Sequence, residues 1–421
     1  MRIVKTAKRQ MSLTLHLPAT FNDGRAHRQS YTPDAWNWVL ADYRCIVQKA
    51  ERAKLDAVIL SPKTHGHGQA SPDDPLKLSI ELARVTERIG LVTPVCTDHN
   101  DPYNLAASLA ALDHISRGRA GWHPKPEKPQ TSSVRTEMTR DYVDLVTGLW
   151  SSWEVEALCD ELPALTAVGA DVCTTRRVGS TRSFVVEPTR PVFYGHPVLL
   201  QSIASQADIE FAARSAEVVL SKTADPLSAQ SLSSRLKDKA RRYGRQPEHL
   251  KMMIGVMPVI GETAEAARQK YQALCESVER DASVSPLSLF DAVAGPCRCS
   301  TRLSSIDPLA DDSMKEGMRH GDDRCAIRDG NEELTVVIGT AAQVAEQLFE
   351  WFSHEFVDGF AIVPPHCAGG LDDFIDCVVP ELQRKGVFRS EYRGRSLREH
   401  FALPGPVDSG TKRMFQFSLS F

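Results

Sequence analysis

The sequence predicts an α/β fold, a (β/α)₈ TIM barrel with insertions. Short apolar segments alternate with segments whose apolar residues recur at helical spacing, which is the pattern of parallel βαβ units. Eight strand candidates and at least eight helix candidates follow one another almost regularly. This alternation favours a closed barrel over an open doubly wound sheet.

The predicted strands are short apolar runs bounded by turn residues. They are Leu13–Leu17, Ala57–Leu60, Gly90–Val95, Arg119–Trp122, Val198–Gln201, Glu217–Leu220, Met252–Val259 and Gly359–Val363. The first helix follows the start signal Thr32-Pro33-Asp34 and has its apolar face between Trp36 and Ala50. The other predicted helices are Leu76–Arg88, Leu105–Ile115, Glu137–Trp150, Asp208–Ser215, Leu227–Tyr243, Thr263–Arg280, Ala341–Trp351 and Asp372–Lys385.

We expect one domain over residues 1–421, interrupted by two irregular stretches. Residues 150–190 carry little periodicity of either kind, and residues 282–333 are rich in Ser, Asp, Arg, Gly and Pro. The second stretch lies between the seventh and eighth predicted strands. Long irregular loops in a compact fold are usually lids, binding loops or mobile segments. A lid over the barrel mouth and a simple mobile loop are both open for residues 282–333.

The composition excludes several classes of function. Charged residues make up 25% of the chain, hydrophobic residues 42%, and the formal net charge is -4, so no basic footprint for nucleic acid or an anionic membrane exists. No apolar run approaches the span of a bilayer and no signal peptide begins the chain, which predicts a cytoplasmic protein. The ten cysteines are dispersed and are expected to be reduced thiols.

No metal site is expected. Cys297 and Cys299 form a C-x-C pair in a loop that offers few further ligands, and His65 and His67 have no third ligand in view. A structural loop is the favoured interpretation for the cysteine pair. The histidine pair more plausibly belongs to a loop near the substrate.

Several segments follow a known family pattern in the correct order. The strongest is Val336–Leu403, with GTAAQVAEQLFEWF, VDGF and VVPELQRKGVFR. Other matching segments are Val47–Leu60, Leu82–Val92, Cys96–Leu105, Ala111–Trp122, Gly148–Ala157 and Phe211–Val219. Together these segments resemble the luciferase-like flavin monooxygenases, in the branch with the nitrilotriacetate, dibenzothiophene-sulfone and pristinamycin synthase types.

The resemblance implies a two-component system. Such enzymes receive reduced FMN (FMNH₂) from a separate flavin reductase, react it with O₂ and oxygenate a small organic substrate. The cofactor carries that chemistry, while the protein orients the reactants and excludes water. The resemblance also implies a homodimer formed through barrel helices.

Three histidines are the candidate catalytic residues. His16 ends the first strand, His99 follows the third and His123 follows the fourth. The carboxyl ends of barrel strands form the active face, so all three could meet at the mouth. There a histidine can serve as a general base or as a hydrogen-bonding group.

The candidate cofactor-binding residues follow the third and fifth strands. Thr97 retains a hydroxyl for the flavin ring, while Gln201, Ser202 and Ser205 are expected near the phosphate. The family usually opens the next helix with Gly-Arg, which leaves free N–H groups and a cation for phosphate. Asp208-Ile209 stands there in this chain. An aspartate caps a helix well but repels a phosphate.

Other family contacts are altered as well. Pro62 stands where an aspartate usually faces the ring, His123 where an asparagine is usual, and Glu127 where a serine commonly contacts the cofactor. The flavin-phosphate site is therefore degenerate. Either Arg119, Lys125 or Ser205 holds the phosphate, or FMN is not bound in the family manner.

Two other functions remain open. The first is a flavin-free homologue, acting as a partner subunit or as a cofactor-independent acid/base enzyme at the barrel mouth, because fold alone does not fix function. The second, which the sequence supports less, is a barrel that uses a deazaflavin. The substrate and the reaction subtype are not encoded in any motif that we find.

Overall fold

The computed structural model describes residues 9–18, 33–61, 74–98, 100–125, 133–151, 194–203, 205–221, 226–280, 324–329, 332–365 and 369–405. Structural statements below concern these residues. Most of the two irregular stretches, 150–190 and 282–333, lies outside them, and so do His65, His67, Cys297 and Cys299. The expectation of a lid over 282–333 therefore stays a prediction.

Eight parallel strands close into a barrel, as predicted. They are β1 (Ser12–Pro18), β2 (Ala57–Ser61), β3 (Gly90–Cys96), β4 (Ala120–Lys125), β5 (Val198–Ile203), β6 (Val218–Ser221), β7 (Lys251–Ile260) and β10 (Gly359–Ile362). The strand order runs β10-β1-β2-β3-β4-β5-β6-β7, and β10 also pairs with β7. That last pairing, with Gly359 opposite Met253, removes the open edges of the sheet.

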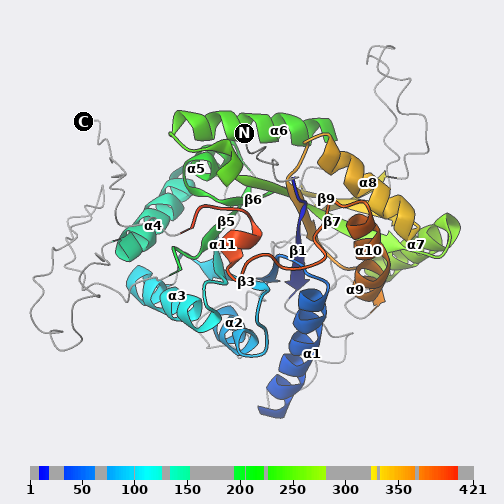
Figure 1. Cartoon of the computed structure of the whole chain (residues 1–421), viewed down its shortest axis with the longest axis horizontal. Coiled ribbons are helices and arrows are strands. Elements are labelled where there is room, and N and C mark those ends of the chain that lie inside the picture. The colour runs from blue at the N-terminus through cyan, green and yellow to red at the C-terminus, as the bar shows by residue number, and fades with distance from the viewer. Residues whose placement is uncertain are drawn as a thin grey trace, which may run out of the picture.

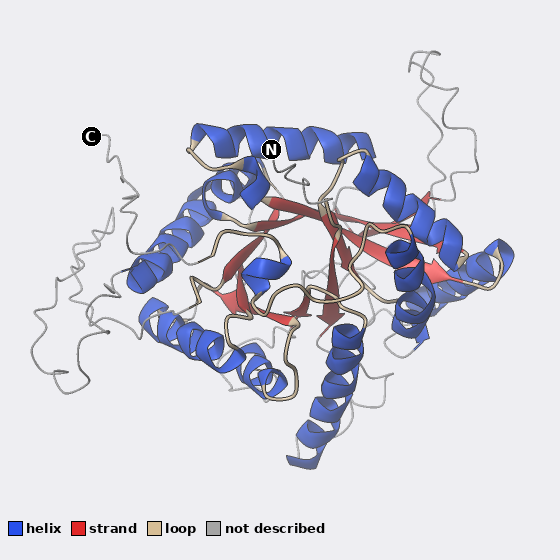
Figure 2. Ribbon diagram, in the orientation of Figure 1, coloured by secondary structure: helices blue, strands red, loops and turns tan. Residues whose placement is uncertain are grey.

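Helices form a ring around the barrel (Figures 1 and 2). They are α1 (Pro33–Arg52), α2 (Pro75–Ala83), α3 (Pro102–Ser116), α4 (Ser133–Ser151), α5 (Gln206–Ser215), α6 (Pro226–Arg242), α7 (Ala264–Arg280), α8 (Ala341–Ser353), α9 (Gly369–Asp373) and α10 (Val379–Arg384). A π-helical turn, Phe374–Val378, joins α9 to α10. Each helix expected from periodicity is therefore present.

Helix α2 ends at Ala83, earlier than the predicted Arg88, and a buried arginine explains why. The Arg119 guanidinium donates hydrogen bonds to the carbonyl oxygens of Ala83 (3.0 Å), Thr86 (2.9 Å) and Ile89 (2.8 Å). The Glu51 carboxylate accepts from the backbone N–H of Ile89 at 2.9 Å and from the two N–H groups before it. These long-range partners replace the hydrogen bonds that a longer helix would make.

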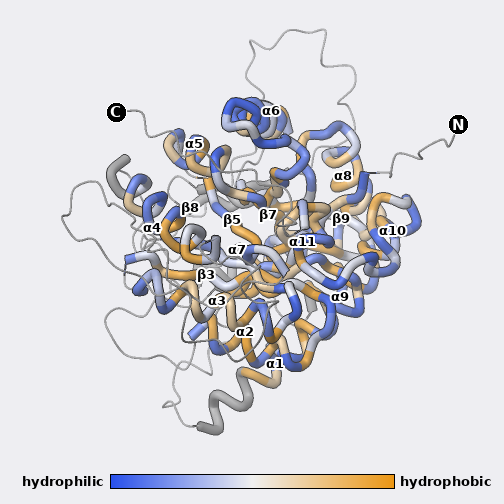
Figure 3. The backbone as a smooth tube through the Cα atoms, turned by 60° about the vertical axis from the view of Figure 1, so that its left-hand side comes forward, coloured by the Kyte–Doolittle hydropathy of each residue, from blue (hydrophilic) through white to orange (hydrophobic). Residues whose placement is uncertain are grey.

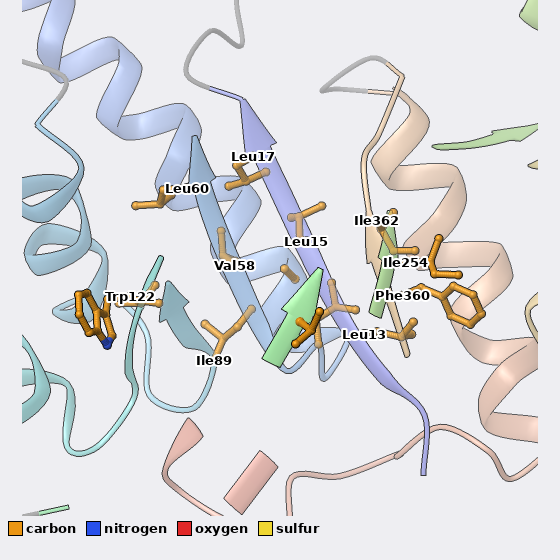
Figure 4. Packing of buried hydrophobic residues seen from close by; sticks show 14 of the residues in the cluster. Leu13, Leu15, Leu17, Val58, Leu60, Ile89, Trp122, Ile254, Phe360 and Ile362 are labelled. Carbon is orange, nitrogen blue, oxygen red and sulfur yellow. The ribbon is translucent and has the colours of Figure 1, made fainter. Parts of the chain in front are cut away.

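The main hydrophobic core lies between the strands and the helices. Leu13, Leu15 and Leu17 alternate along β1 and pack with Val58 and Leu60 of β2 in this layer (Figure 4). Along the helices, hydrophobic and hydrophilic stretches alternate, as expected for amphipathic helices that cover a barrel (Figure 3). Because side chains alternate along a strand, the intervening β1 residues face the barrel interior.

The barrel interior is closed at the amino end of the strands by the C-terminal segment. Helix α11 (Leu397–His400) lies over the centre of the ring in Figure 1. Leu397 is fully buried and belongs to the same interior cluster as Ile59 and Leu200. A Cβ added at Gly90 would lie 2.3 Å from Leu397 Cδ1, and one at Gly121 3.1 Å from its Cδ2. The glycines at the start of β3 and β4 therefore make room for this leucine.

A buried polar network fixes the same segment to β2. Asp56 is fully buried, forms an ion pair with Arg389 and accepts a hydrogen bond from the Leu13 N–H at 2.7 Å. Tyr392 donates to the Leu55 carbonyl at 2.6 Å and stacks on His400, with ring centroids 4.8 Å apart. Burial raises the pKa of Asp56 to about 6, although the Arg389 charge acts in the opposite direction.

One hairpin was not expected from the sequence. Strand β8 (Arg324–Asp329) pairs antiparallel with β9 (Glu332–Gly339), which pairs in parallel with the second half of β7. The hairpin therefore extends the sheet beyond the eight barrel strands. Its first strand lies inside the stretch 282–333, which we had expected to be irregular throughout. The polar, charged β8 sequence RCAIRD carries no clear strand period, which is why the pattern was missed.

Candidate active site

The carboxyl ends of β1 and β4 bring two of the candidate histidines into the barrel. His16 and His123 are each 1% exposed. On β1, Leu15 and Leu17 belong to the outer core, so His16 between them faces the interior. On β4, the Trp122 indole packs against Trp150 of α4, with ring centroids 5.6 Å apart. This outward tryptophan directs the next residue, His123, inward.

His123 forms a hydrogen-bonded pair with Ser202 of the neighbouring strand. The His123 Nε2 atom lies 3.0 Å from Ser202 Oγ. Ser202 follows Leu200 at a spacing of two on β5, and Leu200 is part of the barrel-interior cluster. The sequence placed His123 among catalytic residues and Ser202 among cofactor contacts. The structure joins them into one unit at the mouth.

Thr97 lies directly beyond β3. Its backbone N–H donates to the carbonyl of Lys125 at 2.9 Å, which continues the pairing of β3 with β4 by one residue. Its Oγ1 atom is buried and makes no hydrogen bond within the described part of the chain. A buried hydroxyl without a partner is unfavourable by about 1–3 kcal/mol, so this atom is suited to a ligand.

Gln201 does not join this group. It precedes Ser202 on β5 and shares a strand face with Leu199, which packs in the outer core. Gln201 is 7% exposed, and its Oε1 atom has no hydrogen-bond partner among the described residues. The prediction grouped Gln201 with Ser202, but the two occupy opposite faces of the strand. We leave Gln201 out of the candidate site.

Ser205 caps helix α5 and is engaged by Asp208. The Ser205 backbone N–H and its Oγ each donate to Asp208 Oδ2 at 2.8 Å, and Asp208 N–H donates back to Ser205 Oγ at 3.3 Å. This reciprocal arrangement is a capping box. The spacing Ser-x-x-Asp announces it in the sequence. Ser205, which was expected to contact the phosphate, therefore forms its hydrogen bonds with Asp208 in the first turn of α5.

Two other candidates for holding phosphate differ in their placement. Arg119 is 2% exposed, precedes the first residue of β4 and gives its guanidinium to carbonyl oxygens of the segment after α2. It lies at the end of the strand opposite the mouth, so the alternative that Arg119 holds phosphate is wrong. Lys125 is half-buried at the carboxyl end of β4, where a mouth residue belongs.

His99 lies outside the described residues, and so do Pro62 and Glu127. Their roles stay predictions. Within the described ranges, no group of three or more His, Cys, Asp or Glu side chains is arranged to hold a metal ion. In the same ranges, no helix has the length and apolar character needed to cross a bilayer.

Sequence reasoning missed Tyr142 of α4. Its hydroxyl is buried and makes no hydrogen bond among the described residues. Burial raises the pKa of Tyr142, and the charges of Asp101 and Cys96 raise it further. Cys96 is the last residue of β3, and Asp101 is the N-cap of α3. A tyrosine on the core side of an amphipathic helix carries no functional signal by itself, which is why periodicity could not single it out.

Comparisons with known proteins agree with this architecture. The luciferase-like monooxygenase family model matches residues 19–357. The N-acetyl-S-(2-succino)cysteine monooxygenase of Bacillus subtilis (strain 168) is 30% identical over 448 residues, covering 96% of this chain and 99% of that protein. Nitrilotriacetate monooxygenase component A of Aminobacter aminovorans is 31% identical over 420 residues, covering 88% of this chain and 91% of that protein.

Among solved structures, a riboflavin lyase with modified FMN and the substrate riboflavin superposes with a TM-score of 0.70. It is 26% identical, and the superposition covers 96% of each chain. Because the family model spans most of the sequence and a curated relative aligns over nearly all of it, this chain belongs to the luciferase-like monooxygenase family.

Proposed function

We propose that this protein is a flavin-dependent monooxygenase, which uses FMNH₂ and O₂ to oxygenate a small organic substrate. Family membership supports the reaction class. The observation that carries the proposal is the buried His123–Ser202 pair at the carboxyl ends of β4 and β5. Barrel enzymes place their chemistry at this end of the strands.

We propose further that FMNH₂ arrives from a separate reductase and that the chain works in the cytoplasm as a homodimer. One relative, the nitrilotriacetate monooxygenase component A, is named as one part of a divided system, which supports this proposal. Light scattering of the purified protein tests the dimer. A monomeric mass at micromolar concentration would contradict it.

The ring end of the site fits a flavin. Thr97 Oγ1 is a buried hydroxyl that lacks a protein partner, and it could donate to a ring carbonyl or accept from a ring N–H. Ser202 and His123 offer further polar atoms on the neighbouring strands. The N-terminus of α5 does not favour a phosphate, because the Asp208 carboxylate accepts from the Ser205 N–H there and carries the same sign of charge.

Bound reduced flavin would supply the electrons that activate O₂ for insertion into the substrate. The protein residues supply orientation and proton handling. The hydrogen bond between Ser202 Oγ and His123 Nε2 fixes the orientation of the His123 ring. If Ser202 donates, the ring proton is on Nδ1, and if Nε2 donates, the proton is on Nε2. His123 can then hold or release a proton in a site that its burial keeps away from bulk water.

A flavin-free acid/base enzyme is the second candidate. The capped N-terminus of α5 favours it, because a phosphate anchor is missing there, and the His123–Ser202 pair could act without a cofactor. Binding of reduced flavin separates the two candidates. Only the monooxygenase requires it.

Anaerobic titration of the protein with FMNH₂ is the primary test. We expect saturable binding, followed by slower reoxidation than that of free FMNH₂ when oxygenated buffer is added. Failure to bind at high flavin concentration would refute the monooxygenase and favour the second candidate. Substrate screening can begin with the two compounds after which the relatives are named, N-acetyl-S-(2-succino)cysteine and nitrilotriacetate.

Substitution of His123 tests the proposed proton-handling role. With any substrate that the screen identifies, His123→Ala should lower turnover by roughly a hundredfold or more, as expected for loss of a general acid/base group. His354→Ala is the control, because that histidine is exposed on the far end of α8. Unchanged turnover in a folded His123→Ala protein would remove His123 from the mechanism.

A further inference from the structure

We propose that Asp208 is a specificity-determining residue, which makes this protein recognise a flavin by its ring and ribityl portion while its terminal phosphate adds little to affinity. The inference rests on the proposed function, since it concerns how the same site takes its cofactor. It predicts that riboflavin, the uncharged flavin, binds about as tightly as FMN.

The geometry of α5 is the first argument. An anion binds at a helix N-terminus through free N–H groups and the positive end of the helix dipole. At α5, Asp208 Oδ2 accepts from both the Ser205 N–H and the Ser205 hydroxyl at 2.8 Å. Its other carboxylate oxygen lies 3.5 Å from Thr136 Oγ1. The carboxylate thus lies at the N-terminus of α5, and it carries the same sign of charge as a phosphate.

Two other helices at the carboxyl end of the barrel begin with a carboxylate at the N-cap itself. Helix α3 begins after β3 with Asp101, whose carboxylate accepts from the Asn104 N–H at 3.0 Å. Helix α2 begins after β2 with Asp74, whose carboxylate accepts from the Leu76 N–H at 3.0 Å. Each carboxylate offsets the positive end of its helix.

Two arginines considered for this region do not reverse the balance. Arg119 belongs to the opposite end of the barrel, where its guanidinium binds carbonyl oxygens. Arg235 of α6 contacts the side chain of Gln206, the first residue of α5, but it is exposed. Solvent and salt therefore screen its charge, and it compensates Asp208 only weakly.

The experiment compares the affinities of the protein for two flavins that differ in the terminal phosphate. The wild-type protein is titrated anaerobically with FMNH₂ and with reduced riboflavin by equilibrium dialysis. We expect the two dissociation constants to agree within about fivefold, and inorganic phosphate should not displace FMNH₂. An FMNH₂ preference beyond that range, or displacement by phosphate, overturns the inference while leaving the proposed function intact. If neither flavin binds, the proposed function fails and the inference fails with it.

The Asp208→Asn variant assigns the effect to the carboxylate. Its side-chain amide oxygen still caps α5, so the helix stays formed. Loss of the negative charge should tighten FMNH₂ binding about tenfold and leave reduced riboflavin unchanged. Glu262→Gln, an exposed position just after β7 at the same end of the barrel, is the matched control and should change neither constant. Equal affinity of wild type and Asp208→Asn for FMNH₂ would refute the role of Asp208.

Discussion

Two threonines in and directly after β3 have buried hydroxyl groups with different surroundings. One hydroxyl has a partner in the protein, and the other is suited to a ligand. Thr93 of β3 is 1% exposed, and its hydroxyl lies 2.6 Å from the hydroxyl of Ser79 on α2. Thr97, just beyond the strand, has a buried hydroxyl with no protein partner among the described residues. The first hydroxyl contributes to stability, whereas the second is a cost that only a bound molecule can offset.

Thr→Val substitution should therefore act in opposite directions at the two positions. Thr97→Val should stabilise the flavin-free protein by up to about 1 kcal/mol and weaken flavin binding by about five- to tenfold. Thr93→Val is the matched control and should destabilise the protein by about 1 kcal/mol without changing flavin affinity. Urea unfolding and flavin titration measure both quantities. A stability loss in Thr97→Val would show that its hydroxyl has a partner in the protein.

At the scale of elements, the starts of β3 and β4 are shaped for the C-terminal helix. Gly90 and Gly121 lie against the two terminal carbons of Leu397, so any larger side chain there would displace it. The helix α5 illustrates the converse, because its capping box fixes its first turn with local partners alone. The placement of α11 depends on contacts with residues far away in the chain. The first turn of α5 depends on two residues only three positions apart.

A double-mutant cycle tests the contact between β3 and α11. Leu397→Ala should lower the free energy of unfolding by roughly 3 kcal/mol, because it removes a fully buried side chain. Gly90→Ala should also destabilise the protein, but less so in the Leu397→Ala background, with a coupling of about 1 kcal/mol or more. Gly148→Ala in α4 is the control, because nothing lies within 4 Å of the added methyl group. Strict additivity would mean that Gly90 and Leu397 do not share this space.

At the scale of the whole molecule, the last described segment seals the barrel. The Arg389 guanidinium donates hydrogen bonds to the Asp56 carboxylate, directly before β2, and to the carbonyl oxygen of His400. One buried network therefore joins the start of β2 to helix α11. His400 is 6% exposed. Its burial, assisted by the charge of Arg389, lowers its pKa to about 4 from an ordinary value of 6.5.

This shift makes the seal sensitive to acid. Between pH 6.5 and pH 4 the unfolded chain takes up a proton on His400 that the folded protein refuses, so stability present above pH 6.5 is lost as the pH falls. His400→Asn cannot take up that proton. The free energy of unfolding of the wild type, relative to His400→Asn, should therefore fall by about 3 kcal/mol from pH 7 to pH 4. The exposed His354→Asn serves as the control, and a pH-independent difference for His400→Asn would contradict the buried neutral histidine.

The sequence by itself determined the fold and the end of the barrel where function lies. Periods of two and of about 3.6 residues are local properties, so the eight strands and the surrounding helices could be predicted. The rule that barrel chemistry occurs at the carboxyl ends of strands then selected His16, Thr97 and His123. Asp208 was likewise predicted to suit the start of a helix, whereas its reciprocal bonding with Ser205 was not predicted.

Only the tertiary structure decided which of these groups meet. The pairing of His123 with Ser202 depends on the register of β4 and β5, and the outward placement of Gln201 depends on which face of β5 the helices cover. Three of the carbonyl oxygens that bind Arg119, those of Ala83, Thr86 and Ile89, lie 30 to 36 residues away from it in the chain. Contacts between segments that are distant in sequence leave no periodic pattern in either segment. They therefore cannot be predicted from composition or from residue spacing.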